Sequence, residues 1–382
     1  MRYFMYSGKI GSGLLLLLVF CSCRPEMKLP AGFEAAVEKI KSTIAPDSRT
    51  RVFDIVCSRE KNHWLIRAET TVPEAKHALD SLVTEYFKTA EIHTDIQLLP
   101  QEQLQDSVWG LISLSVGNIK KSPDHTAELI DQLLLGTEVK ILKKQSGWFL
   151  VQSPYDYLGW ITRGSLLRTD RQGIDNWRRQ ELVIMDVNYT QIYAQPDIKS
   201  QVVCDAVLGC LLAKTGKEGS WLSVKLPDGR EGYAEAGCFK AYQKPDMAYL
   251  PDREKISARA LQMLGIPYLW GGNSIKGFDC SGFTGTVFAS EGYRLPRDAN
   301  MQVGLGEIVV PESDFSNVFP GDLLFFGRDA NITHVAVSLG GYNFIHSASP
   351  SYVRINSLNE KDKLYDEFEK KRLKVIKRII KN

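Results

Sequence analysis

The chain has 382 residues, of which 44% are hydrophobic and 24% are charged, and its formal net charge at pH 7 is +2. This length accommodates several domains, and the composition is that of a folded globular protein. A net charge so close to zero argues against a protein dedicated to nucleic acid, which needs a strongly basic face, so we expect no nucleic-acid partner.

The first residues predict an export signal. Arg2 and Lys9 precede an apolar run over residues 14–20. That run is too short for a membrane-spanning helix, but it suits the apolar segment of a secretory signal. We therefore expect an exported protein of the cell envelope, facing the periplasm or the cell exterior.

The end of this signal resembles that of a bacterial lipoprotein. Cleavage after the small residue Ser22 would leave Cys23 as the new first residue, although the two residues before Ser22 are larger than usual in such signals. We expect residues 1–22 to be removed and Cys23 to carry a lipid that anchors the protein to a membrane. Residues 23–29 then form a tether. Simple secretion without a lipid is the alternative.

The remaining cysteines argue against a metal site. Cys21 belongs to the signal and Cys23 is the lipidation site, which leaves five of the seven cysteines, and an odd number leaves at least one free thiol. The chain has no Cys-x-x-Cys pair and no closely spaced pair of histidines, so we expect neither a metal nor another cofactor. Cys204, Cys210 and Cys238 form one disulfide among them or remain unpaired.

Residues 30–105 predict a small α+β domain. Residues 33–44 have helical spacing, residues 51–70 have the pattern of a hairpin, and a further helix begins at Pro73. The residues of this domain indicate no function.

The next region contains an internal repeat with an offset of 73 residues. Its five anchors are Ile119, Pro123, Gly136, Trp148 and Gly159, which recur as Ile192, Pro196, Gly209, Trp221 and Gly232. The segments between the anchors are short and rich in β-formers, which is typical of small barrels. Each copy resembles the bacterial SH3-like domain. We place the two domains at residues 106–170 and 171–242.

Residues 253–382 predict the last domain, with two helices followed by strands. In "GFDCSGF", Cys280 lies between Asp279 and Ser281 with glycines on both sides, whereas a structural cysteine usually has apolar neighbours. The next residues have a helical pattern, which places Cys280 at a helix start. Free N–H groups there lower a thiol pKa and favour a nucleophile. A buried structural cysteine is the alternative.

Two histidines provide a candidate base. His334 and His346 lie in strand-like runs on either side of Gly340. A hairpin with an odd-numbered loop centred on Gly340 would place the two side chains opposite each other on one face, whereas a two-residue loop would turn His346 to the other face. In the first register His334 takes the thiol proton and His346 orients His334. Two unrelated histidines are the alternative.

Together the motifs of the last domain resemble the NlpC/p60 cysteine peptidases, papain-like enzymes that cut bacterial cell-wall peptides. The motifs are "PYLWGG" at 267–272, "DCSGF" at 279–283, "RDAN" at 297–300, "PGDLLFF" at 320–326, "THVAVSLG" at 333–340 and "FIHSAS" at 344–349. The resemblance implies a multidomain α+β protein with a papain-like domain behind two SH3-like barrels. It also implies a catalytic triad of Cys280, His334 and His346.

The same resemblance extends to the pocket. It implies that Tyr268 donates to the oxyanion, and that Trp270, Asp279, Ser281 and Asp298 line the pocket. A role for Tyr268 and Trp270 in the hydrophobic core is the alternative. The Asp279 carboxylate would raise the thiol pKa unless a cation occupied it, so we expect a substrate ammonium group beside it.

Family members with tandem SH3-like domains suggest the substrate. They cleave the bond between γ-D-glutamate and a diamino acid in peptidoglycan stem peptides with a free N-terminal L-alanine. By this resemblance Glu128 and Tyr157 of the first barrel bind that amine together with Asp279. The alternative is that Glu128 is a solvated surface residue and Tyr157 a barrel residue.

These expectations describe a monomeric γ-D-glutamyl-diamino acid endopeptidase of the cell envelope. Two other functions are compatible with the sequence. One is a papain-like amidase or acyltransferase, and the other is a peptidoglycan-binding protein with an inert last domain. The presence of Cys280, His334 and His346 argues against the inert domain.

Overall fold

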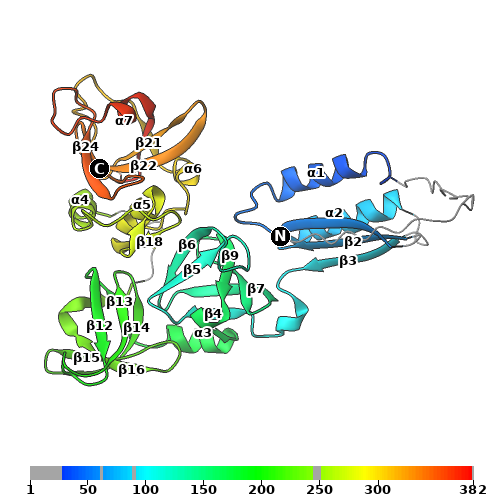
Figure 1. Ribbon diagram of the computed structural model, residues 1–382, viewed down its shortest axis with the longest axis horizontal. Coiled ribbons are helices and arrows are strands. Elements are labelled where there is room, and N and C mark those ends of the chain that lie inside the picture. The colour runs from blue at the N-terminus through cyan, green and yellow to red at the C-terminus, as the bar shows by residue number, and fades with distance from the viewer. Residues whose placement is uncertain (1–27, 61–62, 88–91, 244–250, 381–382) are drawn as a thin grey trace, which may run out of the picture.

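The computed structural model describes residues 28–60, 63–87, 92–243 and 251–380, and it contains four units in chain order (Figure 1). The expected multidomain α+β architecture is confirmed. The expected signal, Cys23 and nearly all of the tether lie outside the described residues. No helix in the described ranges combines the length and the apolar character needed to span a lipid bilayer.

The N-terminal domain is a three-stranded sheet packed against two helices. Strand β2 is central, antiparallel to β1 and parallel to β3. Side chains from both helices and the sheet, among them Phe33, Leu79 and Ile66, are buried in one core. The elements are α1 (Phe33–Ile44), β1 (Phe53–Glu60), β2 (His63–Thr70), α2 (Pro73–Tyr86) and β3 (Ile92–Leu98).

The internal repeat folds as two barrels with the same strand order. The first sheet runs β10-β4-β7-β8-β9-β5-β6, and the second runs β17-β11-β14-β15-β16-β12-β13 in the equivalent direction. The first barrel contains β4 (Trp109–Ile112), β5 (Val116–Lys120), β6 (Leu129–Leu134), β7 (Glu138–Gln145), β8 (Trp148–Gln152), β9 (Leu158–Thr162) and β10 (Leu166–Thr169). The second contains β11 (Leu182–Met185), β12 (Tyr189–Tyr193), β13 (Val202–Val207), β14 (Leu211–Glu218), β15 (Trp221–Lys225), β16 (Glu231–Glu235) and β17 (Phe239–Ala241). Helix α3 (Arg171–Arg178) connects the barrels.

The last domain packs helices against a six-stranded sheet of order β20-β25-β21-β22-β23-β24. Helix α5 is buried on several sides, and Phe283, Val287 and Phe288 lie in the core. The elements are α4 (Arg253–Leu261), β18 (Asn273–Ser274), β19 (Gly277–Phe278), α5 (Cys280–Ser290), α6 (Ala299–Gln302), β20 (Glu307–Val309), β21 (Leu323–Arg328), β22 (Asn331–Gly340), β23 (Asn343–Ser347), β24 (Val353–Ser357), α7 (Glu367–Arg372) and β25 (Leu373–Arg378).

The described cysteines are all unpaired, which decides between the alternatives for the second barrel. Cys204, Cys210 and Cys238 are free, as are Cys57 and Cys280. Cys210 is fully buried in the core of the second barrel, where it behaves as a small apolar side chain.

Candidate active site

Cys280 is the first residue of α5, as the sequence pattern predicts. The Asp279 side chain caps the helix, because its Oδ1 accepts from the Gly282 backbone N–H at 2.6 Å. A Cβ atom at position 282 would lie 2.0 Å from the carbonyl oxygen of Gly272, so only glycine fits there. The tight "GFDCSGF" turn therefore places the sulfur at the N-terminal end of a largely buried helix, where Cys280 lines a cleft.

One cleft of about 760 Å³ brings together all ten residues that the sequence analysis assigned to catalysis and substrate binding. Its lining comes from the last domain, from the first barrel and from the N-terminal domain. The predicted residues in it are Cys280, His334, His346, Tyr268, Trp270, Asp279, Ser281, Asp298, Glu128 and Tyr157. Their individual roles remain predictions.

A chain of hydrogen bonds defines the proton positions on the two histidines. Asn356 Oδ1 accepts from Arg354 Nε, and it lies 3.0 Å from His346 Nε2, so that nitrogen must carry a proton and donate. His346 Nδ1 is then an acceptor, and His334 Nε2 donates to it at 2.7 Å. The free nitrogen of His334, Nδ1, is left as an unprotonated acceptor. A base needs this tautomer.

The hairpin register differs from the expected one by a shift along the strands. Val337 pairs with Ile345 and Ser338 with Phe344, so the turn is centred beyond Gly340 and contains an irregularity. The two histidines are therefore on one face but diagonal rather than directly opposite. Diagonal side chains on neighbouring strands are still within reach of each other, which explains why the hydrogen bond forms.

Asn356 should matter for catalysis even though it is remote from the sulfur. Asn356→Ala removes the acceptor that defines the His346 tautomer, so we expect kcat to fall about tenfold while KM stays unchanged. This loss is smaller than the factor of about 10²–10⁴ that a general base contributes to the rate. Asn356→Asp keeps an acceptor and should retain most activity. The exposed Asn331→Ala serves as the control in the same steady-state assay. Equal kcat values for Asn356→Ala and the control would contradict the tautomer argument.

The resting thiol is protonated, which corrects the expectation of a lowered pKa. Burial and then the Asp279 carboxylate raise the pKa of Cys280 to about 12. Backbone N–H bonds from Val335 and Ser281 lower the pKa but do not compensate for burial. The bond from Val335 also places the sulfur next to the residue that follows His334.

Both histidines are neutral near pH 7. Burial lowers the pKa of His334 well below its usual value and lowers that of His346 to about 4. A protonated thiol beside a neutral imidazole is the starting state of a general-base mechanism. In such a mechanism the proton moves as the sulfur attacks.

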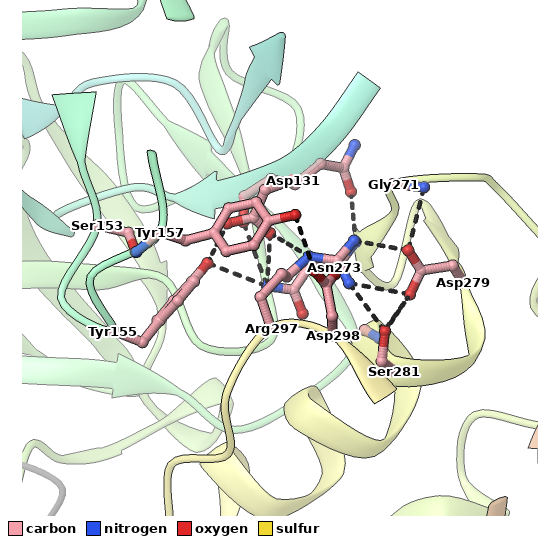
Figure 2. A network of polar contacts seen from close by, with 12 residues as sticks. Asp131, Ser153, Tyr155, Tyr157, Gly271, Asn273, Asp279, Ser281, Arg297 and Asp298 are labelled. Atoms are coloured by element: carbon pink, nitrogen blue, oxygen red, sulfur yellow. Dashed lines mark hydrogen bonds and ion pairs between the residues drawn. The ribbon is translucent and has the colours of Figure 1, made fainter. Parts of the chain in front are cut away.

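Arg297 supplies the cation beside Asp279 (Figure 2). Its Nη2 lies 2.6 Å from Asp279 Oδ2 and its Nη1 donates to Oδ1 at 3.1 Å, a bidentate pair. The Gly271 backbone N–H and the Ser281 hydroxyl also donate to this carboxylate. The expectation that a substrate ammonium group would be the cation there is therefore corrected, because Arg297 already occupies both oxygens.

The same arginine joins the last domain to the first barrel. Its Nε donates to Asp131 Oδ1 at 2.7 Å, and Asp131 also accepts from the Tyr155 hydroxyl and from Asn273 Nδ2 (Figure 2). The side chains of Arg297 and Asp131 are only 2% and 1% exposed. A buried network of charges therefore runs from the barrel to the residue next to the nucleophile.

The remaining predicted side chains lie around the rim of the cleft. Trp270 is 62% exposed, which excludes the core alternative for it, and its Nε1 donates to Glu128 Oε1 at 2.8 Å. Tyr157 is buried, and its hydroxyl donates to Asp298 Oδ2 at 3.1 Å. The first barrel thus contacts the last domain through two pairs of cleft residues.

Tyr268 is half-buried and close to the sulfur. Burial, followed by the charges of Cys280 and Asp279, raises the pKa of its phenol. The hydroxyl therefore keeps its proton over the physiological pH range and is able to donate to a developing oxyanion.

Among the residues that the structure describes, one group has the composition of a metal site. The donor atoms of His334, His346 and Glu369 lie within 4.8 Å of one another. Internal bonds already engage them, since the histidines bond to each other and Glu369 pairs with Arg372. Burial raises the pKa of Glu369 to about 7, which further weakens it as a ligand.

Four residues of the site were missed by sequence reasoning: Arg49, Asp131, Arg297 and Asn356. Arg297 is the first residue of the "RDAN" motif, next to Asp298, and this position in a motif was the available signal. The others lie in different domains or on a neighbouring strand, and no local pattern marks them.

Comparisons with known proteins agree with this architecture. Residues 265–370 match the model of the NlpC/P60 family, and residues 115–166 match that of the bacterial SH3 domain. A dipeptidyl-peptidase 6 from Lysinibacillus sphaericus is 29% identical over 67% of this chain and 93% of the relative. A gamma-D-glutamyl-L-lysine dipeptidyl-peptidase from Bacillus subtilis is 30% identical over 56% of this chain and 71% of the relative.

A solved structure extends the likeness to the fold. The crystal structure of an NlpC/P60 family protein from Bacillus cereus superposes with a TM-score of 0.61 at 24% identity. The match covers 72% of this chain and all of the other.

Proposed function

Because the chain belongs to the NlpC/P60 family of peptidases, we propose that it cleaves peptidoglycan stem peptides between γ-D-glutamate and the diamino acid. The observation that carries this proposal is a chain of hydrogen bonds that runs from Asn356 through His346 to His334. Both histidines line the same cleft as Cys280. The names of the Lysinibacillus and Bacillus relatives support the choice of bond. The first barrel and the lipoprotein-like signal support action in the cell envelope.

The proposed reaction is an acyl transfer through the thiol. His334 Nδ1 takes the proton of Cys280 as the sulfur attacks the γ-carbonyl carbon, and Tyr268 with the Cys280 backbone N–H stabilises the oxyanion. The proton then passes to the departing amine of the diamino acid, which leaves a thioester. Water, deprotonated by His334, hydrolyses the thioester and releases L-Ala-γ-D-Glu.

The free amine of L-alanine is proposed to lie beside Glu128, Tyr157 and Asp298. All three line the cleft, and the hydrogen bond from Trp270 lowers the pKa of Glu128 and keeps it ionised. Two carboxylates and a phenol are suitable partners for an ammonium group. Asp279 no longer belongs to this set, since Arg297 pairs with both of its oxygens, whereas the bonds from Arg49 and Tyr157 to Asp298 both end on Oδ2.

The test is mass spectrometry of L-Ala-γ-D-Glu-diaminopimelate after incubation with the full-length protein, with and without N-acetylation of the alanine. We expect release of L-Ala-γ-D-Glu from the free tripeptide. Cleavage of the acetylated peptide should be at least about 100-fold slower, because an uncharged group loses the charge-assisted hydrogen bonds.

Other outcomes would identify the other functions. An adduct between the glutamyl group and an added amine would indicate an acyltransferase. Binding of wall fragments without any cleavage would indicate the inert binding protein. Equal rates on free and acetylated tripeptide would refute the amine site while leaving the choice of bond intact.

A further inference from the structure

The N-terminal domain reaches the cleft through a single turn. The turn between α1 and β1 contains Asp47 and Arg49, and Arg49 lines the same cleft as Cys280. Of the residues that the structure describes in this domain, Arg49 alone belongs to that lining. The sequence indicated no function for the domain, so this contact is the first clue to one.

Docking on the first barrel fixes the backbone of the turn. Two apolar residues of the N-terminal domain pack on three of the barrel, namely Val52 and Leu99 on Leu142, Leu150 and Leu158. The Leu158 backbone N–H donates to the Arg49 carbonyl oxygen at 2.8 Å. An ion pair between Glu69 and Lys143 adds a further link. The position of the turn therefore does not depend on the Arg49 side chain.

The Arg49 side chain crosses from this turn to the last domain. Its Nη1 donates to Asp298 Oδ2 at 2.7 Å and to Asn300 Oδ1 at 2.8 Å. Asp47 holds the other edge of the guanidinium through bonds to Nε and Nη2 at 2.9 and 2.7 Å. Asp298 Oδ2 also accepts from Tyr157, so three domains meet at one carboxylate.

We propose that this Arg49 bridge closes the cleft beside Tyr157 and Asp298 and makes the N-terminal domain a specificity element. A peptide chain has no passage between groups that are bonded at these distances. The bridge therefore admits peptides whose free N-terminus ends at this point and excludes peptides that continue beyond it. The inference rests on the proposed function, because it places the substrate amine beside Tyr157.

The test compares two substrates with the full-length protein and two variants. Arg49→Ala removes the bridge. Arg51→Ala is the matched control, since the exposed Arg51 side chain donates to the neighbouring Thr50 carbonyl and does not line the cleft. The substrates are L-Ala-γ-D-Glu-diaminopimelate and the same peptide with one glycine added before the alanine.

We expect Arg49→Ala to raise kcat/KM for the extended peptide relative to that for the tripeptide by about fivefold. This factor corresponds to the free energy of a partly exposed ion pair. Arg51→Ala should leave this ratio unchanged. An unchanged ratio in Arg49→Ala would overturn the proposal.

A second readout does not depend on the peptide reaction. We compare the rate at which a bulky maleimide alkylates Cys280 with the rate for the smaller iodoacetamide. The ratio of the two rates reports how open the cleft is. This ratio should rise in Arg49→Ala and, by a smaller factor, in Asn300→Ala, which removes one of the two bonds that Arg49 makes to the last domain and leaves the bond to Asp298. If the wild-type protein cleaves neither peptide, the proposed function is wrong. The ratio of alkylation rates still tests the bridge in that case, because a rise in the variants supports it and a constant ratio refutes it.

Discussion

Cys280→Ala is expected to abolish release of L-Ala-γ-D-Glu, with kcat lowered by at least about 10⁴-fold. Loss of a covalent nucleophile leaves only binding and oxyanion stabilisation, which cannot replace the acyl-enzyme step. The assay is the mass spectrometry of the free tripeptide described above. The variant should stay folded, because alanine retains the helix propensity of the position.

Cys204→Ala is the control for this substitution. Cys204 is a half-buried free cysteine of the second barrel, and its removal should leave kcat unchanged. Cleavage by Cys280→Ala within tenfold of the wild-type rate would show that the sulfur is not the nucleophile. Loss of activity in both variants, with both proteins folded, would point to a role for cysteine outside the cleft.

Arg297→Gln is expected to lower both the stability and the reactivity of the protein. It leaves Asp131 and Asp279 buried without their cation, and breaking such a pair costs about 3–5 kcal/mol of unfolding free energy. Because Arg297 also lowers the pKa of the thiol, its loss should slow alkylation of Cys280 at any given pH. Urea denaturation and iodoacetamide kinetics measure the two effects.

The pH profile separates the electrostatic effect from unfolding. With the pKa of Cys280 at about 12, the alkylation rate of the wild-type protein should rise about tenfold per pH unit between pH 6 and 9, without a plateau. Arg297→Gln should give a parallel line at lower rates. Alkylation faster than in the wild type would mean that the variant has opened the site by unfolding.

Asp131→Asn is the matched variant on the barrel side. It keeps the pair of Arg297 with Asp279, so alkylation should stay close to the wild-type rate while the stability falls by less than in Arg297→Gln. If both variants slowed alkylation equally, the contact with the barrel rather than the local charge would control the thiol.

The placement of Cys280, His334 and His346 in one cleft was predictable because short motifs contain these residues. Cys280 lies in a glycine-flanked turn before a helical pattern, and the two histidines lie in alternating strands around one turn. Side chains alternate between the two faces of a hairpin, so a register shift by an even number of residues leaves them on the same face. The prediction that His334 and His346 share a face was therefore right, although the register was shifted. The barrels were predictable for a different reason, because an internal repeat can be found by aligning the sequence with itself.

The sequence could not show what burial and distant partners do. The net sign of the Cys280 pKa shift depends on how deep the sulfur lies, and a motif does not specify depth. Arg297 meets Asp131, and Arg49 meets Asp298, only after three separately folded domains dock. Such pairs are far apart in the chain, and a single sequence contains no signal that links them.

The two barrels share a strand order but differ in the side chains at equivalent positions. Asp131 pairs with Ile119 across the first barrel, and the equivalent position, opposite Ile192 in the second, is Cys204. With the offset of 73 residues, the cleft residues Glu128 and Tyr157 correspond to Gln201 and Arg230, and Tyr155, which donates to Asp131, corresponds to Asp228.

Only the first copy therefore has the groups that complete the active site. The second copy uses its Arg230 to donate to the Ser113 carbonyl oxygen of the first at 2.9 Å. The first copy thus contributes side chains to the cleft, and the second copy contacts the first through this bond. A chimera that exchanged the two barrels would present a thiol to Arg297 and should lose the active site while it keeps the fold.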